Sequence, residues 1–397
     1  MSNKAMNPFE IDREVEVTPA GARRLRSGHL WIFAADVRAE PEGEPPPFVR
    51  VLDHARNCLG YAFYSKSSQI RLRLLTRGGE PPSIDLFRRR VHDSIQRRSA
   101  MLAQGRACRL VFGEADQLPS IIADRYEECL ALQTLSSGAE AIKPLLVELF
   151  LDALPLSGIA ERNDIKARLL EGLDERSSVL WGSIPERIRI RETGSAFDVD
   201  IMRGHKTGFF LDQSENRIAA AKHARGRALD CFCNTGGFAL HFARACESVM
   251  GVDASPLAIG LANHNASING VSNVTFREAN VFDFLREVER AGERFDTICL
   301  DPPAFAKSRS ALSSARAGYK EINLRAMKIL NPDGILVTSS CSYHLSESDF
   351  LSLICDAARD SHRYVQVLEK RSQAWDHPVL ASMPETHYLK CLILRLL

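Results

Sequence analysis

The stretch 227–253, "RALDCFCNTGGFALHFARACESVMGVD", decides the fold class of this chain. "RALDCF" is a short apolar run typical of a strand, "GGFALHFARAC" has the spacing of a helix, and "SVMGVD" is again strand-like. Gly236 and Gly237 allow a tight turn between the first strand and the helix and let a ligand approach the backbone closely. A strand, a helix and a second strand in this order indicate a parallel α/β sheet.

The same alternation continues to the end of the sequence and predicts a doubly wound, Rossmann-like sheet with helices on both faces. Ser255 is the expected N-cap of the helix that follows residue 253. The later strand candidates are 274–282, 295–303 and 334–342, and the later helix candidates are 255–270, 283–292, 321–330 and 347–361. The last two strand candidates, 364–370 and 390–397, have no helix between them, so we expect one antiparallel strand.

Two smaller segments precede this sheet. In residues 1–85, a Pro-rich break at 39–48 is followed by β-like runs at 48–64 and 68–76, which predict a small barrel. The linker "TRGGEPPS" (76–83) leads into residues 86–195, for which we expect an α+β domain. Its predicted elements are an arginine-rich helix at 87–101, a hairpin at 120–136, a helix at 140–154 and a second hairpin at 187–201. The third domain is then 196–397.

Composition limits the class of protein. The 397 residues suggest two or three domains, and 45% hydrophobic with 25% charged residues is typical of a soluble globular protein. The first residues carry charges throughout, so a signal peptide is not expected, and no apolar run is long enough to span a membrane. Ten cysteines without a CxxC pair predict neither a metal site nor disulfides, and reduced thiols favour the cytoplasm.

The formal net charge is +1, but arginines are concentrated at 22–31 and 87–101. These clusters suit a phosphate backbone, although the second would also suit a solvated helix face.

Acidic and polar residues follow the predicted parallel strands, where ligands bind in open α/β sheets. Asp253 is placed to accept hydrogen bonds from ribose hydroxyls, Asn280 to meet an adenine edge, and Asp301 to begin a rigid "DPP" turn. A GxGxxG fingerprint is absent, which disfavours a dinucleotide. This set suits S-adenosylmethionine, which has a ribose, an adenine and an amino-acid tail but no pyrophosphate. The alternative is a pair of turn glycines with an exposed aspartate.

A single cysteine, Cys341, stands in "VTSSCSYHLS" (337–346) at the end of a predicted buried strand. It is either a small core residue or a nucleophile presented at the edge of the sheet that also holds the cofactor.

The sequence resembles the RlmI-type 23S ribosomal RNA cytosine-5 methyltransferases over nearly its whole length. The motifs that carry the resemblance are "GHKTGFFLDQ" (204–213), "CNTGGF" (233–238), "DPPAF" (301–305), residues 318–342 and "DHPV…PETHYLK" (376–390). The resemblance implies an N-terminal PUA-like RNA-binding domain, a central α+β domain and a Rossmann-like methyltransferase domain. It also implies S-adenosylmethionine as cofactor and large-subunit ribosomal RNA as partner, and it leaves a homodimer open.

The resemblance further assigns residues to the site. Cys341 and Asp301 are the implied catalytic residues, and His377 and Lys390 could line the mouth of the active site. The implied cofactor-binding residues are Phe210, Asp212, Gln213, Asp230, Asn234, Thr235, Gly236, Gly237, Asp253, Asn280 and Asp301. The chain departs from the family in having Asn234 for an aromatic residue, Asn280 for an acid and Ala304 for a lysine.

Carbon 5 of cytosine is a poor nucleophile, and a thiolate that adds to carbon 6 converts the ring into an enamine able to attack a sulfonium methyl. Removal of the carbon-5 proton and loss of the thiolate then complete the reaction. We therefore expect Cys341 to be the nucleophile and Asp301 to hydrogen-bond the ring nitrogens. The target base must be extruded or single-stranded.

Three alternatives come from other chemistries. A methyltransferase acting on an exocyclic or ring nitrogen would favour an aromatic after the two prolines, where this chain has Ala304. A non-catalytic RNA-binding assembly factor could retain the fold without needing Cys341. A nicotinamide oxidoreductase is disfavoured because the glycine fingerprint is missing.

Overall fold

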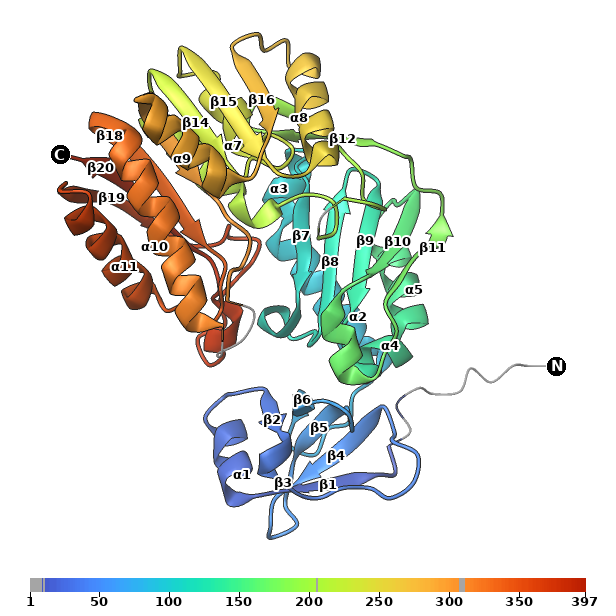
Figure 1. Ribbon diagram of the computed structural model, residues 1–397. Helices are drawn as coiled ribbons and strands as arrows, with labels where there is room; N and C mark the ends of the chain where they lie inside the picture. The colour runs from blue at the N-terminus through green and yellow to red at the C-terminus, as the bar shows by residue number, and fades with distance from the viewer. Residues whose placement is uncertain (1–8, 10, 205, 307–310) are drawn as a thin grey trace. The chain divides into compact units, whose positions relative to one another are not determined.

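The computed structural model describes residues 9, 11–204, 206–306 and 311–397 (Figure 1). The chain forms two compact units whose segments alternate along the sequence. The first holds the chain as far as Ile190 together with Val199–Leu211 and Asp376–Thr386, and the second holds Arg191–Asp198, Asp212–Trp375 and His387–Leu397. His205, within the motif 204–213, lies outside the described residues.

The first unit begins with a six-stranded sheet of order β2-β6-β5-β4-β1-β3, in which only β1 and β4 pair in parallel among the described pairs. The strands are β1 (Glu14–Val17), β2 (Trp31–Phe33), β3 (Val37–Ala39), β4 (Phe48–Leu52), β5 (Cys58–Tyr64) and β6 (Ile70–Arg77). Helix α1 (Pro19–Arg26) starts at the N-cap Thr18, and η1 (Ala34–Asp36) follows β2. Val15, Ile32, Val51 and Leu72 lie in its core, so the predicted small barrel is confirmed.

A second sheet in the first unit has the order β11-β10-β9-β8-β7. Its strands are β7 (Cys108–Phe112), β8 (Ile121–Tyr126), β9 (Cys129–Thr134), β10 (Gly158–Asn163) and β11 (Arg176–Gly182). The helices are α2 (Ile84–Arg97), α3 (Ser99–Ala103), α4 (Ser137–Ala141) and α5 (Lys143–Ala153), with 3₁₀ turns η2 (Gly113–Asp116) and η3 (Lys166–Glu171). The structure confirms the helices predicted at 87–101 and 140–154 and the hairpin at 120–136, and it adds β7, β10 and β11.

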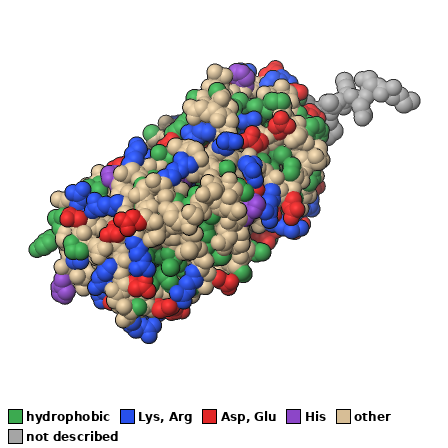
Figure 2. All heavy atoms as spheres, turned by 90° about the horizontal axis from the view of Figure 1, so that it is seen from above, with side chains coloured by type: hydrophobic (Ala, Val, Ile, Leu, Met, Phe, Trp, Pro, Cys, Tyr) green, Lys and Arg blue, Asp and Glu red, His purple; other side chains and the backbone are tan. Residues whose placement is uncertain are grey.

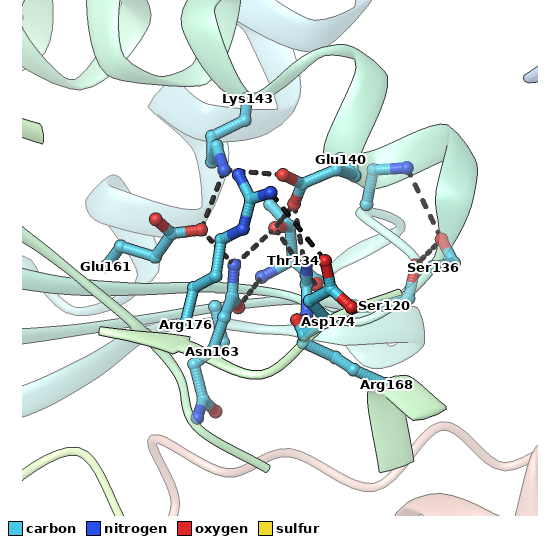
Figure 3. A network of polar contacts seen from close by, with 12 residues as sticks. Ser120, Thr134, Ser136, Glu140, Lys143, Glu161, Asn163, Arg168, Asp174 and Arg176 are labelled. Carbon is cyan, nitrogen blue, oxygen red and sulfur yellow. Dashed lines mark hydrogen bonds and ion pairs between the residues drawn. The ribbon is translucent and has the colours of Figure 1, made fainter. Parts of the chain in front are cut away.

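A network of buried and half-buried polar side chains joins α4, α5, β10 and η3 (Figure 3). Lys143 Nζ lies 2.6 Å from Glu140 Oε1 and 2.7 Å from Glu161 Oε1, and Arg168 Nη1 lies 3.0 Å from Glu140 Oε2. Asn163 Nδ2 donates to Glu161 Oε1 as well. Since two cations face two carboxylates, the network is electrically balanced and serves the structure of this sheet.

The hairpin predicted at 187–201 is present as β12 (Ile188–Glu192) and β13 (Ser195–Val199), and it straddles the division between the two units.

The second unit is built on a seven-stranded sheet of order β16-β15-β14-β17-β18-β20-β19. The strands are β14 (Arg227–Cys231), β15 (Ser248–Asp253), β16 (Val274–Glu278), β17 (Phe295–Leu300), β18 (Leu330–Ser340), β19 (Val365–Arg371) and β20 (Lys390–Leu396). Strand β20 pairs antiparallel with both β18 and β19, whereas the pairs among β14 to β18 are parallel. The predicted Rossmann-like sheet with one antiparallel strand is confirmed.

Helices cover both faces of this sheet (Figure 1). They are α6 (Ser214–His223), α7 (Gly237–Phe242), α8 (Pro256–Ile268), α9 (Val281–Ala291), α10 (Leu312–Ile329) and α11 (Glu347–Asp360), with 3₁₀ turns η4 (Leu211–Gln213) and η5 (Pro384–Thr386) at the unit boundaries. Successive strand residues point to opposite faces: Ile298 packs with α9, α10 and α11, whereas Cys299 packs with α6 and α7.

Some boundaries differ from the sequence-based expectation. Helix α10 begins at Leu312 rather than 321, and α9 begins at Val281 because Asn280 caps it. Strand β18 begins at Leu330 and includes the "NPDG" stretch, where Asp333 has a φ of 62° and the pairing with β17 shifts register.

Each of the three predicted domains contains one large sheet, and the boundaries at 85 and 195 stay predictions. In the part of the chain that the structure describes, no helix combines the length and apolar character needed to cross a bilayer.

Candidate active site

The candidate site lies at the carboxyl edge of the parallel sheet. Asp230 is the penultimate residue of β14, Asp253 ends β15, Asp301 follows β17 and Cys341 follows β18. These strands are neighbours in the order β15-β14-β17-β18 and run parallel, so the four side chains belong to one edge. This is the edge at which ligands bind in open α/β sheets.

The loop between β14 and α7 has an unusual backbone. Phe232, Asn234 and Gly236 have φ values of 63°, 47° and 85°, although such angles are costly for a side chain as large as that of Phe232. Two features favour glycine at position 236. Its φ is positive, and a Cβ there would lie 3.0 Å from the ring of Phe276. Strained loops of this kind cluster at ligand sites.

Asp253 holds this loop in place. Its Oδ2 accepts a hydrogen bond of 2.9 Å from the Asn234 backbone N–H, and its Oδ1 accepts one of 2.9 Å from the Ser255 backbone N–H. A carboxylate has four lone-pair sites, so the same group can still accept hydrogen bonds from a ligand's hydroxyls.

Asp230 is almost fully buried, and burial raises its pKa to about 8, with the carboxylates of Asp301 and Asp253 acting in the same direction. Its Oδ2 accepts a 2.8 Å hydrogen bond from the Ala239 backbone N–H, while its Oδ1 is buried without a hydrogen-bond partner among the described residues. A buried, unsatisfied acidic oxygen suits a ligand that brings a cationic donor.

Gln213 and Asp301 are joined directly, since Gln213 Nε2 donates to Asp301 Oδ1 at 2.7 Å. Asn216 Nδ2 donates to Gln213 Oε1 at 2.7 Å and fixes the orientation of that amide. Asp212 is buried nearby in sequence, and its Oδ2 accepts a 2.6 Å hydrogen bond from the Tyr388 hydroxyl.

Phe210 is the one predicted cofactor residue that belongs to the first unit. The Lys206 Nζ lies 4.5 Å from the centroid of its ring. Two other predicted residues make local contacts in the second unit: Asn280 Oδ1 caps α9 by accepting from the Phe282 N–H, and the Thr235 carbonyl accepts from Asn265 Nδ2. The contacts of Phe210, Asn280 and Thr235 with a cofactor stay predictions.

Cys341 differs from most of the other cysteines. Seven of the ten are buried, Cys58 and Cys341 are half-buried, and Cys355 is exposed on α11. Burial raises the pKa of Cys231, Cys233 and Cys299 well above the ordinary thiol value. The Cys341 sulfur lies 3.9 Å from the Pro302 carbonyl, so it faces the turn that follows Asp301.

Lys390 is a site residue that sequence reasoning left out of the catalytic set. Strand pairing places it opposite Ser340, one residue before Cys341, and its Nζ donates to the Ser342 and Tyr388 carbonyls at 2.7 and 2.8 Å. Burial lowers its pKa to about 8, while the charge of Cys341 acts to raise it. The only sequence signal was its place in the motif 376–390, because the pairing of β18 with β20 is a tertiary contact.

His377, from the same motif, lies in the first unit and is buried. Its Nδ1 is 2.8 Å from Asp376 Oδ1, and its ring centroid lies 5.4 Å from that of Phe112.

The sheet order, the strained glycine loop and the acidic strand ends agree with an S-adenosylmethionine-dependent methyltransferase. Residues 222–382 match the family profile described as a methyltransferase domain, and residues 15–77 match a PUA-like domain. The chain belongs to the family of ribosomal RNA large subunit methyltransferase I.

This membership is shown by curated relatives that match over nearly the full length. The protein of that name from Tolumonas auensis is 41% identical over 386 residues, which cover 94% of this chain and 96% of the relative. The one from Photobacterium profundum is 42% identical over 379 residues, covering 93% and 95% of the two chains.

Two solved structures share the fold. One is a candidate SAM-dependent methyltransferase from Streptococcus mutans, with a TM-score of 0.83 and 20% identity, and the alignment covers 96% of this chain and 99% of that one. The other is a candidate methyltransferase complexed with SAH, with a TM-score of 0.84, 21% identity and the same coverage.

Proposed function

We propose that this chain transfers a methyl group to carbon 5 of a cytosine in 23S ribosomal RNA through a covalent adduct with Cys341. Its relatives carry the name of ribosomal RNA large subunit methyltransferases, which supports ribosomal RNA as the substrate. The PUA-like match at 15–77 agrees with an RNA substrate.

S-adenosylmethionine is the cofactor, and it supplies an electrophilic methyl group when bound. Asp230 Oδ1 has no hydrogen-bond partner among the described residues, and the carboxylates of Asp253 and Asp301 raise the pKa of Asp230. This excess of acidic groups suits a cofactor that carries a sulfonium and an ammonium. Asp253 would accept hydrogen bonds from the ribose, and the loop 232–236 would lie along the amino-acid tail. Gln213, Asn234, Gly236 and Gly237 belong to the same proposed binding set, as do Phe210, Asp212, Thr235 and Asn280.

The position of Cys341 is the observation that carries the proposal. It is a half-buried thiol at the site edge, beside the Asp301–Pro302 turn and within the electrostatic reach of Lys390. A neighbouring cation favours the thiolate, which is the nucleophilic form. Of the two other cysteines that are not buried, Cys58 belongs to the N-terminal sheet and Cys355 to the surface of α11.

In the proposed mechanism, a lone pair of the Cys341 thiolate forms a bond to carbon 6 of the cytosine, and the former double-bond electrons make carbon 5 nucleophilic. Asp301 hydrogen-bonds the ring nitrogens, oriented by Gln213, and stabilises the adduct. Carbon 5 takes the methyl group as the bond from that methyl to the cofactor sulfur breaks. Water then accepts the carbon-5 proton, the ring double bond re-forms and the bond from the Cys341 sulfur to carbon 6 breaks, which returns the thiolate.

The proposal keeps the division into domains 1–85, 86–195 and 196–397, with the first holding RNA. A cytoplasmic location and a homodimer also stay predictions.

Substitution of the nucleophile tests the mechanism. RNA carrying 5-fluorocytosine at the target should become trapped on the protein, because fluorine cannot leave as a proton does and elimination is blocked. Cys341→Ala should abolish both the trapped adduct, seen as a shifted band on a denaturing gel, and methyl transfer from labelled S-adenosylmethionine. Cys341→Ser should be nearly as inactive, since a hydroxyl ionises far less readily than a thiol.

Cys355→Ala is the matched control, because it removes the exposed thiol of α11 and should keep full activity. Calorimetry should show that Cys341→Ala still binds S-adenosylmethionine. A Cys341→Ala protein that methylates RNA at a near-normal rate would refute the covalent mechanism and favour methylation of a nitrogen.

A further inference from the structure

The first unit contains a cavity of about 680 Å³ whose walls come from several separated parts of the chain. The N-terminal sheet contributes Leu30, Leu75 and Arg77, helix α2 contributes Arg90, and the segment 376–386 contributes Leu380. The last segment is attached to the N-terminal sheet, since His29 Nε2 lies 3.2 Å from Glu385 Oε1. The cavity is therefore formed by the tertiary packing of segments within the first unit.

Three arginines line this cavity: Arg26 is paired with Asp53, whereas Arg77 and Arg90 are held by carbonyl groups. Arg77 donates from Nη1 to the Leu25 carbonyl and from Nη2 to the Gly28 carbonyl, at 2.6 and 2.9 Å. Arg90 donates from Nη1 to the Gln117 carbonyl and from Nη2 to the Leu75 carbonyl, at 2.7 and 2.6 Å. A guanidinium has five N–H donors, so each side chain is oriented and keeps donors for a ligand.

The charge of these two arginines is not neutralised within the cavity. None of the described residues that line it is acidic, and neither Arg77 nor Arg90 forms an ion pair with a described carboxylate. Burial, aided by the neighbouring charge of Arg89, lowers the pKa of Arg90 to about 10, which still leaves it cationic at neutral pH. A half-buried cation without a counter-ion is unfavourable, and a bound anion would offset that cost.

Several other arginines of the predicted RNA-binding clusters are already paired with carboxylates. Arg26 lies 2.6 Å from Asp53, Arg88 2.5 Å from Asp85, and Arg98 2.7 Å from Asp116. On the face shown in Figure 2, Lys and Arg side chains are interspersed with Asp and Glu, in keeping with a net charge of +1. Recognition of a polyanion thus depends on local sites where a positive side chain is not paired with a carboxylate.

We infer that this cavity binds a phosphodiester group of a single-stranded segment of the RNA substrate, between Arg77 and Arg90, with the attached nucleoside against the leucines. The inference rests on the proposed function, because it takes ribosomal RNA as the ligand. Two oriented guanidiniums match the oxygens of a phosphate, and Leu30, Leu75 and Leu380 provide an apolar surface for a base or sugar. Such a contact positions RNA without reading its sequence.

The test uses the full chain and a labelled 23S ribosomal RNA transcript, with affinity measured over a series of KCl concentrations. In the double variant Arg77→Gln/Arg90→Gln, the plot of log affinity against log salt should become less steep by about 0.7, the contribution of one phosphate contact on a single strand. Arg38→Gln is the control, because it removes one positive charge from the same sheet as Arg77, but a charge that is paired with Glu16 at 2.8 Å. It should change the slope much less.

Two further measurements separate binding from folding. Arg90→Lys keeps the charge and should retain most of the slope, and the affinity for S-adenosylmethionine should be unchanged in every variant. If Arg90→Gln lowers the melting temperature, the single variant Arg77→Gln decides instead, because Arg77 is exposed. Its plot should become less steep than that of Arg38→Gln, by at most about 0.7.

A double variant with the same slope as Arg38→Gln would overturn the assignment of the cavity while leaving the proposed function intact. A wild-type chain whose affinity for the transcript does not depend on salt, or that does not bind it, would instead contradict the proposed function and the cavity together.

Discussion

Asp230 and Asp253 stand at the ends of neighbouring strands, but their carboxyl groups meet different surroundings. Asp253 is half-exposed and accepts two backbone hydrogen bonds, and its remaining lone pairs are available to bind hydroxyl groups. Asp230 is buried with one oxygen unsatisfied, and its pKa of about 8 lies near neutrality. A cation bound there would stabilise its ionised form, so the two aspartates offer separate contacts to separate parts of one ligand.

The substitution Asp253→Ala should weaken the binding of S-adenosylmethionine by about 1.5–3 kcal/mol, because charge-assisted hydrogen bonds to the ribose are lost. Isothermal calorimetry measures the effect directly. Glu278→Ala is a suitable control, since Glu278 is an exposed acid at the end of the next strand, β16. Equal affinities in Asp253→Ala and the wild type would mean that the cofactor does not occupy this edge in the proposed way.

The elements α4, α5 and β10 are joined by the polar network of Figure 3, and its two glutamates have lowered pKa values. Burial alone would raise the pKa of Glu140 and Glu161, but hydrogen bonds and the Lys143 ammonium outweigh it. A carboxyl group whose pKa is lower in the folded state stabilises the fold above its unfolded pKa, near 4.5. That stabilisation is lost as the pH falls through the lower, folded pKa.

The double variant Glu140→Gln/Glu161→Gln should therefore be less stable than the wild type, and the difference in unfolding free energy should be largest at neutral pH. The difference in unfolding free energy should shrink as the pH falls below 4.5, because the wild-type carboxylates then become protonated as well. Urea titrations at several pH values would measure it. Glu148→Gln on the exposed side of α5 should show no such difference at any pH, and a constant difference for the double variant would show that the network does not depend on its charges.

For the molecule as a whole, the segment 376–386 returns to the first unit after the chain has completed six strands of the sheet in the second. The Asp376 carbonyl accepts a 2.8 Å hydrogen bond from Arg98 Nη2, and its Oδ2 accepts one of 2.9 Å from the Arg109 N–H. Arg98 also makes a paired contact with Asp116, with both distances 2.7 Å. One buried guanidinium thus connects residues far apart in the sequence.

Arg98→Ala should destabilise the protein by about 3–5 kcal/mol, because it leaves the buried Asp116 without its main partner. The adjacent Arg97 contacts the same Oδ1 of Asp116 at 2.8 Å, but its side chain is 50% exposed, so Arg97→Ala should cost at most about 1 kcal/mol. Chemical denaturation of the two variants provides the comparison. Similar losses for both would contradict the importance of burial for this contact.

Local sequence determined much of this protein. The alternation of apolar runs and helical spacing after residue 227 predicted the order of strands and helices, because strands and helices bury their side chains with different periods. The glycines at 236 and 237 and the acids at 253 and 301 marked the strand ends, where parallel strands bring such residues to one edge. Resemblance of the motifs to a known family then supplied the proposed chemistry.

Only the tertiary structure decided which of these groups interact. Lys390 is adjacent to Cys341 because β20 pairs with β18, and the spacing of 49 residues between them has no periodic signal. The neutralisation of Arg26 and Arg98, but not of Arg77 and Arg90, depends on carboxylates and carbonyls from other elements. A sequence shows where charges are, whereas burial and partners, which set their free energy, arise only when distant segments pack together.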